Sequence, residues 1–287
     1  MRYATATAFR MALEQHINRL CAQGSSTIQR MRRRLAIERF LARLQHSPQN
    51  PWVLKGAFAL YLRFGNRTRT TKDLDIGIDP GRVRRIPSSR SEIAQHLREA
   101  AATQLNDFFA FTIKDEGEQI DPEPDTHVYR FNAQASLDER LFEEFRIDVA
   151  IGAPLVAPTE ELPEGDTLAF AAIAPRRFRA ISLPQHFAEK LHALTFPWKD
   201  RENTRVKDLV DLVLILELNP PEPGAVRDAI KSVFGRRGRQ SIPLKIQDPP
   251  ASWRPMYARL ALGPGILHAQ IGEAVEFLRR YYAKVFP

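Results

Sequence analysis

The sequence predicts a mixed α/β core followed by a helical C-terminal half. Up to about residue 152, short apolar segments with the period of a strand alternate with amphipathic helical segments. A stretch rich in proline and alanine, 153–180, then connects this part to the rest of the chain. From residue 181 onward the apolar residues recur at helical spacing only. We therefore predict one domain over 1–180 and a second over 181–287.

The N-terminal elements follow from the local pattern. The first two helices carry apolar residues near helical spacing and end before the proline-rich break "HSPQNP". A short apolar run that starts at Trp52 predicts a buried strand, and a helix begins directly after Gly56. In "RTTKDLDIGID", residues 73–78 alternate between polar and apolar, which is the pattern of a strand with one buried face.

The later elements are assigned in the same way. Alternation predicts three strands between 108 and 152, the first two joined by the acidic loop "GEQIDPEPD" (117–125). Pro184 lies in the first turn of a C-terminal helix, and "NPPEPG" ends the strongly apolar helix "RVKDLVDLVLILEL". The predicted elements are, in order, helices 4–22 and 26–46, strand 52–56, helix 57–64, strand 73–78, helix 89–106, strands 108–116, 127–135 and 145–152, and helices 183–196, 205–218, 223–234 and 266–283.

Composition excludes several kinds of site and location. The single cysteine, Cys21, excludes an internal disulfide and a cysteine-rich zinc site. The seven histidines never fall at H-x-x-x-H spacing, which argues against a histidine metal site. No apolar run approaches the ~20 residues that span a membrane, and the N-terminus lacks a signal-peptide core. We therefore expect a cytoplasmic protein with no membrane partner.

The net charge of +8 is unevenly distributed. Residues 1–50 carry nine arginines and two acidic residues, residues 51–180 have a net charge of −4, and residues 181–287 have a net charge of +5. An acidic middle between two basic flanks suggests carboxylate chemistry held between surfaces that bind a polyanion. For the run "RMRRRLAIER", a solvated helix face remains an open interpretation.

Asp73 and Asp75 lie on the same side of strand 73–78, because side chains alternate with a period of two. Two like charges at this separation repel, and each is costly to desolvate unless a positive charge lies between them. One interpretation is a divalent metal, since hard oxygen ligands suit Mg²⁺; the other is a hydrated, solvent-exposed face. Asp148, in the alternating segment "RIDVAI", offers a third carboxylate on a neighbouring strand.

The helix that follows Gly56 would direct unpaired backbone N–H groups at an anion, which is a common way to hold phosphate. The order of strand, glycine turn, helix, loop and D-x-D strand therefore suggests a site where metal and backbone amides neutralise the same phosphates. The joint order, rather than any one element, makes this interpretation specific.

Asp211 lies among apolar residues in "RVKDLVDLVLILEL", so we predict that it is at least partly buried and needs a partner. Lys190, on the preceding helix, is the best cationic candidate. In one interpretation Lys190 contacts nucleotide phosphates and Asp211 positions it. In the other the two form a structural ion pair that ties two helices together. We favour the first.

These features resemble the polymerase-β-type nucleotidyltransferases, and within them the AbiEii/AbiGii toxin family, which includes the mycobacterial MenT-type toxins. The similarity runs through "LKGAFALYLRFGNRTRTTKDLDIGI", "AEKLHAL", "RVKDLVDL" with Asp208 and Asp211, and "VFGRRGRQSIP" near Arg236 and Arg237. It covers about residues 50–245. At one position the chain departs from the pattern: Ala57 stands where the family has a second glycine or a serine, although it still offers its backbone N–H.

The resemblance implies a polymerase-β-type nucleotidyltransferase core with a mixed sheet. It implies catalytic roles for Asp73, Asp75, Asp148, Lys190 and Asp211. It implies Mg²⁺ binding by Asp73, Asp75 and Asp148. It implies nucleotide binding by Lys55, Gly56, Ala57, Arg69, Thr71 and Lys190.

The resulting hypothesis is a Mg²⁺-dependent nucleotidyltransferase toxin that adds nucleotides from a nucleoside triphosphate to the 3′ end of tRNA and so blocks translation. A cognate antitoxin is the expected partner. Two alternatives are kept: the same core modifying a protein or a small molecule, and a non-catalytic RNA-binding module. The basic flanks argue against a small-molecule acceptor, and the intact D-x-D argues against a non-catalytic module.

Overall fold

The computed structural model describes residues 2–23, 26–87, 89–114, 119–123, 126–152, 155–156, 158–198, 202–238 and 240–287. The chain forms two compact units. The first comprises Met1–Arg63, Thr70–Ala153 and Glu160–Ala180. The second comprises Phe64–Arg69, Pro154–Thr159 and Ile181–Pro287.

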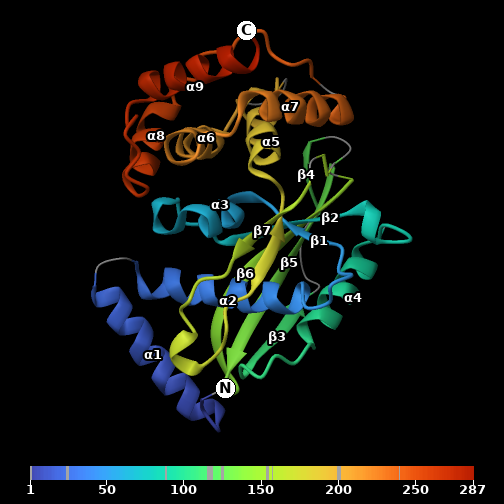
Figure 1. The fold of residues 1–287 in the computed structure, drawn as a ribbon, viewed down its shortest axis with the longest axis vertical. Helices are drawn as coiled ribbons and strands as arrows, with labels where there is room; N and C mark the ends of the chain where they lie inside the picture. The colour runs from blue at the N-terminus through green and yellow to red at the C-terminus, as the bar shows by residue number, and fades with distance from the viewer. Residues whose placement is uncertain are drawn as a thin grey trace. The chain divides into compact units, whose positions relative to one another are not determined.

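The first unit is built on an eight-stranded mixed sheet (Figure 1). Its order is β3-β5-β6-β2-β1-β8-β7, and β4 pairs with β5 outside this path. The pairs β2–β6 and β1–β8 are parallel, and the other pairs are antiparallel. The strands are β1 (Trp52–Leu54), β2 (Asp73–Ile78), β3 (Phe109–Lys114), β4 (Gln119–Glu123), β5 (Thr126–Leu137), β6 (Arg140–Ile151), β7 (Glu160–Pro163) and β8 (Arg177–Ala180).

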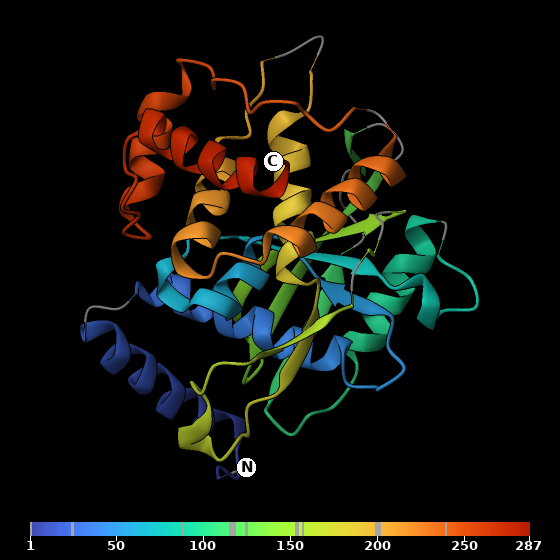
Figure 2. The same cartoon turned by 45° about the horizontal axis from the view of Figure 1, so that its top comes forward.

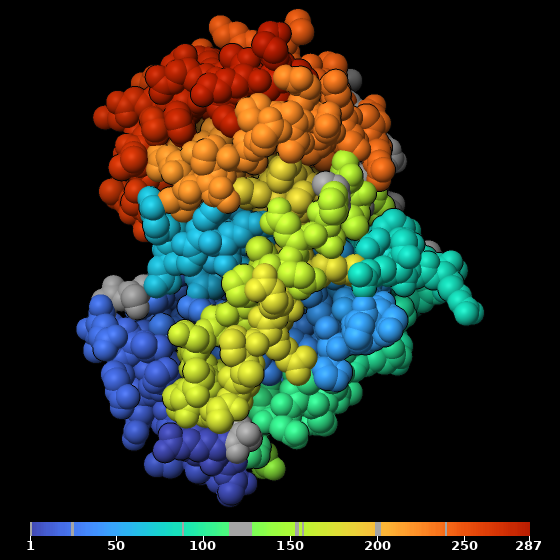
Figure 3. Space-filling model, in the orientation of Figure 1, coloured from blue at the N-terminus to red at the C-terminus, as the bar shows by residue number. Residues whose placement is uncertain are grey.

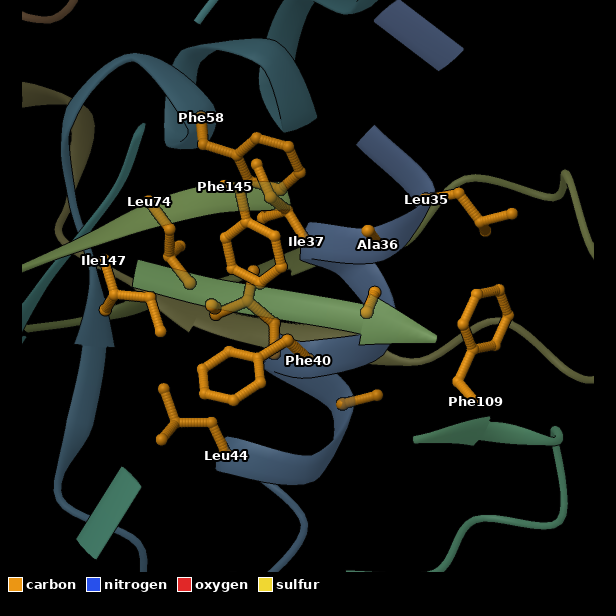
Figure 4. Packing of buried hydrophobic residues seen from close by; sticks show 14 of the residues in the cluster. Leu35, Ala36, Ile37, Phe40, Leu44, Phe58, Leu74, Phe109, Phe145 and Ile147 are labelled. Atoms are coloured by element: carbon orange, nitrogen blue, oxygen red, sulfur yellow. The ribbon is translucent and has the colours of Figure 1, made fainter. Parts of the chain in front are cut away.

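The helices of this unit are α1 (Ala6–Ala22), α2 (Ile28–Leu44), α3 (Gly56–Phe64) and α4 (Arg90–Ala101), with short 3₁₀ turns at Pro80–Arg82 and Ala169–Ala171. A threonine or serine side chain caps the N-terminus of α1, α2 and α4. Helix α2 packs against β6 and α4. Figure 4 shows Phe40 and Leu44 of α2 close to Phe145 and Ile147 of the sheet.

The alternation of side chains along β2 determines which face of the sheet carries its two aspartates. Leu74 and Ile76 are fully buried in the core, which also takes in Ile147 of β6. Because successive side chains point to opposite faces, Asp73 and Asp75 lie on the face away from this core.

Helix α2 also carries buried charge. Arg39 Nε donates to Asp107 Oδ2 at 2.7 Å, and Arg43 Nη2 donates to Asp107 Oδ1 at 2.6 Å. Arg39 also pairs with Glu164, at 2.9 Å. Burial by itself would raise the pKa of Asp107, but hydrogen bonds and charge from Arg43 and Arg39 hold that pKa below its ordinary value. Part of the basic N-terminal charge therefore serves the core.

The second unit contains α5 (Leu183–Thr195), α6 (Val206–Leu218), α7 (Pro223–Arg237), α8 (Trp253–Leu262), α9 (Ile271–Val285) and a 3₁₀ turn at Gly65–Arg67. Helix α6 is apolar on nearly all sides and packs against α5, α8 and α9, as expected of a central helix. Helix α9 lies against α6 and α7 (Figure 2). In Figure 3 the orange to red atoms of α7, α8 and α9 form one continuous surface of this unit.

The predicted α/β class is confirmed, two local predictions are wrong, and one helix was missed. The expected connector 153–180 contains β7 and β8, which are too short, at four residues each, to show a clear alternation. The expected loop 117–125 contains β4, and the rest of that loop and residues 115–116 of the first predicted strand lie outside the described residues. Helix α8 was not predicted; Pro255 lies in its first turn, where proline is tolerated.

No helix among the described residues combines the length and the apolar character needed to cross a membrane.

Candidate active site

The carboxylates predicted from the sequence lie on two neighbouring strands, and a third strand brings an arginine to them. Asp75 of β2 lies opposite Asp148 of β6, which in turn lies opposite Arg130 of β5. In the adjacent row, Asp73 lies opposite Arg146. Since residues in register on neighbouring strands share a face, these five side chains belong to one polar face of the sheet.

Two arginines pair with two of the three carboxylates on this face. Arg130 donates two hydrogen bonds to Asp148, from Nε to Oδ1 at 2.8 Å and from Nη2 to Oδ2 at 2.6 Å. Arg146 Nε donates a single bond to Asp73 Oδ1 at 2.6 Å. The bond to Asp148 raises the pKa of Arg130, and the charges of Asp73 and Asp75 add to the shift. Neither arginine was predicted from the sequence, although the alternation in "VYRFN" and "FRIDV" places them on the polar faces of their strands.

Gly56 is in direct contact with Asp75. Its φ of +63° is in the left-handed region, and helix α3 starts at this residue. A Cβ at position 56 would lie 1.9 Å from Asp75 Oδ2, so only glycine fits against that carboxylate. The backbone N–H of Lys55 also donates to the Asp75 carbonyl oxygen, at 2.9 Å. The structure therefore joins the glycine turn and the D-x-D strand.

Three other predicted nucleotide-binding residues lie beside this turn or strand. The stem of Lys55 is buried over Gly77, where an added Cβ would be 3.1 Å from Lys55 Cδ. Ala57 is buried in the first turn of α3. The Thr71 hydroxyl accepts a bond from the Asp73 N–H, at 3.3 Å, and thereby shapes the start of β2. Their roles toward a nucleotide stay predictions.

A divalent cation suits part of this face. Asp73 and Asp75 supply hard carboxylate oxygens on one side of β2, and this is the donor chemistry that Mg²⁺ prefers. Among the described residues, however, no group of three or more Asp, Glu, His or Cys side chains is arranged to hold a metal ion. Both oxygens of Asp148 face Arg130 instead. The pair fits a metal, and the predicted role of Asp148 as third ligand stays a prediction.

The second unit holds the other predicted site residues in a buried cluster. Arg69 Nε and Nη2 each donate to Asp211, both at 2.9 Å. Lys190 Nζ lies 2.7 Å from Asp211 Oδ2 and 2.8 Å from Asp208 Oδ1. The Asp211 side chain is 1% exposed.

The charges in this cluster hold one another ionised. Burial alone would raise the pKa of Asp211, but the charges of Lys190 and Arg69 outweigh burial and lower that pKa. Burial would lower the pKa of Lys190, but Asp208 and Asp211 raise it. The predicted contact between Lys190 and Asp211 is confirmed; the bond from Arg69 to Asp211 was missed, because Arg69 was assigned to the nucleotide.

Comparison with one known structure supports the α/β nucleotidyltransferase fold. The chain is similar to MenT4, a nucleotidyltransferase toxin from Mycobacterium tuberculosis, with a TM-score of 0.58 and 16% identity over 96% of this chain and 89% of that chain. It is also similar to an H. pylori protein provisionally described as a nucleotidyltransferase, with a TM-score of 0.40 and 16% identity over 89% of this chain and 94% of that chain. No curated protein sequence matches the chain.

The sequence profile described as "Nucleotidyl transferase AbiEii toxin, Type IV TA system" matches residues 39–270. This range includes β2, the Gly56 turn, Lys190 and Asp211. The resemblance inferred from the sequence motifs is thereby confirmed, and a non-catalytic module loses its support. The chain belongs to the AbiEii family of nucleotidyltransferase toxins.

Proposed function

We propose that this nucleotidyltransferase toxin adds nucleotides from a nucleoside triphosphate to the 3′ end of tRNA, in a reaction that requires Mg²⁺, and so blocks translation. The observation that carries the proposal is the contact of Asp75 with the Gly56 turn, beside Asp73 on the same strand face. The family, which is named for type IV toxin–antitoxin systems, supports a cognate antitoxin as a partner.

Different residues at this face would bind the triphosphate and the metal. The first N–H groups of α3 are free of partners within the helix, and they are suited to hold the triphosphate beside Asp75. A Mg²⁺ ion held by Asp73 and Asp75 would supply charge neutralisation for the phosphates and the attacking hydroxyl. A bond forms between the 3′ oxygen and the α-phosphorus, pyrophosphate leaves, and the hydroxyl proton is released.

A basic groove in the first unit supports an RNA acceptor. A hollow of about 520 Å³ is lined by Ser26, Thr27, Gln29, Arg30, Arg33, Thr70 and Lys72. A second hollow, of about 400 Å³, shares Arg33 and Lys72 with the first and adds Lys114 and Arg146 among its lining residues. Arg146 pairs with Asp73, so the basic groove leads to the carboxylate face. A phosphodiester backbone is the ligand that such a groove suits.

The arginine run of α2 contributes less to this groove than its charge suggests. Arg32 pairs with Glu14, Arg33 with Glu143 at 3.1 Å, and Arg34 with Glu38 at 3.0 Å. Lys72 and Lys114 differ, because neither forms an ion pair with any residue that the structure describes. We therefore assign the first contact with RNA phosphates to these lysines.

The test is incubation of the protein with total tRNA, Mg²⁺ and each labelled nucleoside triphosphate in turn. We expect label at the 3′ end of RNA with at least one nucleotide, and none with the Asp75→Ala variant or in excess chelator. Mg²⁺-dependent label on a protein or a small molecule, with none on any RNA 3′ end at low salt, would show that the core serves another acceptor.

A further inference from the structure

We infer that Arg130 is a built-in counter-cation that keeps Asp148 out of the metal coordination sphere, so that Asp73 and Asp75 alone hold the divalent cation. The inference rests on the proposed metal role of those two aspartates. It changes the expectation from the sequence, where all three carboxylates bind the metal.

The guanidinium of Arg130 faces both carboxylate oxygens of Asp148. Arg130 presents two N–H groups to the two oxygens of Asp148, at 2.8 and 2.6 Å. This fork arrangement is the strong form of an arginine–carboxylate contact. A dication bound to the same carboxylate would lie next to the guanidinium, and the two positive charges would repel. Asp148 therefore binds either the Arg130 guanidinium or the metal ion, but not both.

The Arg130–Asp148 pair is less exposed than the neighbouring Arg146–Asp73 pair. The Asp148 and Arg130 side chains are 12% and 25% exposed, whereas those of Asp73 and Arg146 are 29% and 42% exposed. Arg146 donates one hydrogen bond to Asp73, and ion pairs with this degree of exposure add little stability. A metal can therefore displace Arg146 from Asp73 far more readily than Arg130 from Asp148.

Arg130 differs in charge from its neighbours on the same face of β5. Among the described side chains of this strand, those that share the face of Arg130 are Val128, Asn132, Gln134 and Ser136, all neutral. The sheet itself does not require a cation at position 130. Its charge instead lies in register with Asp148, and the charges of Asp73 and Asp75 contribute to the raised pKa of Arg130.

The experiment is Mn²⁺ titration of the purified protein, with free Mn²⁺ measured by electron paramagnetic resonance and no nucleotide or RNA present. Arg130→Gln should bind Mn²⁺ about tenfold more tightly than wild type, because Asp148 becomes available as a ligand. The double variant Arg130→Gln/Asp148→Asn, which keeps the net charge of the wild type, should return to within about threefold of wild type. Arg140→Gln, which removes an exposed arginine of the same sheet, should change nothing.

Two outcomes would overturn the inference. If the double variant binds Mn²⁺ about tenfold more weakly than wild type, Asp148 is a ligand in the wild type. If Arg130→Gln fails to gain affinity, including the case in which neither protein binds Mn²⁺, Arg130 does not exclude Asp148. Should Arg130→Gln fail to fold, Arg130→Lys keeps the charge, loses the fork and should gain affinity to a smaller extent. Since no transfer is measured, the result is independent of whether tRNA is the acceptor.

Discussion

The two carboxylate clusters of this protein differ in burial and in how firmly their cations are held. Asp73, on the sheet face of the first unit, is 29% exposed and takes one bond from an arginine that is 42% exposed. Asp211, in the helical unit, is 1% exposed and takes bonds from both Arg69 and Lys190. Cations pair with carboxylates in both clusters, but of these two carboxylates only Asp73 is substantially exposed to water.

This difference predicts different consequences of mutation. An exposed ion pair contributes about 0–1 kcal/mol to the free energy of unfolding, so a metal can replace its cation with little loss of stability. Removing one member of a buried pair leaves an uncompensated charge and destabilises by about 3–5 kcal/mol. The sheet cluster is therefore suited to binding an exchangeable ligand, whereas the helical cluster holds its own unit together whether or not it also acts on the nucleotide.

The largest effect is expected for Asp75→Ala. Transfer should fall about 10³-fold or more, because the metal pair and the contact with the Gly56 turn are both lost. The melting temperature should stay close to wild type, because the change removes a carboxylate from a face that carries two others. Rates from labelled triphosphate, measured beside circular dichroism melts, check this. A folded Asp75→Ala variant with a rate near wild type would refute the metal assignment.

Asp211→Ala should cause the largest loss of stability. It leaves Arg69 and Lys190 without the carboxylate between them, at a cost of about 3–5 kcal/mol in the free energy of unfolding. The matched control on the sheet, Asp73→Ala, should cost about 1 kcal/mol or less. Urea unfolding of both variants measures the comparison directly. Equal losses would mean that burial does not distinguish the two clusters.

Lys190→Ala separates the two interpretations of that lysine. Arg69 still pairs with Asp211 in this variant, so we expect a smaller loss of stability than for Asp211→Ala, about 1–3 kcal/mol. A role toward the triphosphate predicts in addition a higher KM for the nucleotide. A lower melting temperature with unchanged transfer kinetics would establish the purely structural interpretation.

The pH dependence should show the same contrast. The pKa of Asp211 is lowered, so its contribution to stability is present above the ordinary aspartate pKa and is lost as pH falls through the lowered value. The pKa of Lys190 is raised, so its contribution is lost only as pH rises through a value above that of an ordinary lysine. Melting temperature should therefore fall at both extremes, and Asp211→Asn should flatten the acid side. If Asp211→Asn leaves the fall of melting temperature at low pH unchanged, that fall comes from Asp107, whose pKa is also lowered.

The smallest effect is expected in the basic groove. Lys72→Ala/Lys114→Ala should weaken tRNA binding several-fold and reduce the slope of log affinity against log salt by about 1–2. Affinity for the triphosphate should not change. The control Arg84→Ala/Arg140→Ala removes the same charge from exposed positions that line neither hollow. Equal weakening by both double variants would mean that tRNA senses only net charge.

The sequence by itself determined the elements whose pattern is long or strict. Strand β2 was predicted at its observed bounds, because six alternating residues report one buried and one polar face. The burial of Asp211 and its need for Lys190 also followed from the sequence, since a carboxylate in an apolar helix requires a cation. The elements missed were the short ones, such as β8, whose formation depends on pairing with β1 and β7.

Only the tertiary structure decided which charges meet. Arg130 reaches Asp148 through the register of β5 and β6, and Arg69 reaches Asp211 across 142 residues of sequence. Local periodicity reports which face a side chain occupies, but the partner on that face depends on strand register and helix packing between distant segments. For that reason the carboxylate strand could be predicted from the sequence, and the arginine that holds Asp148 could not.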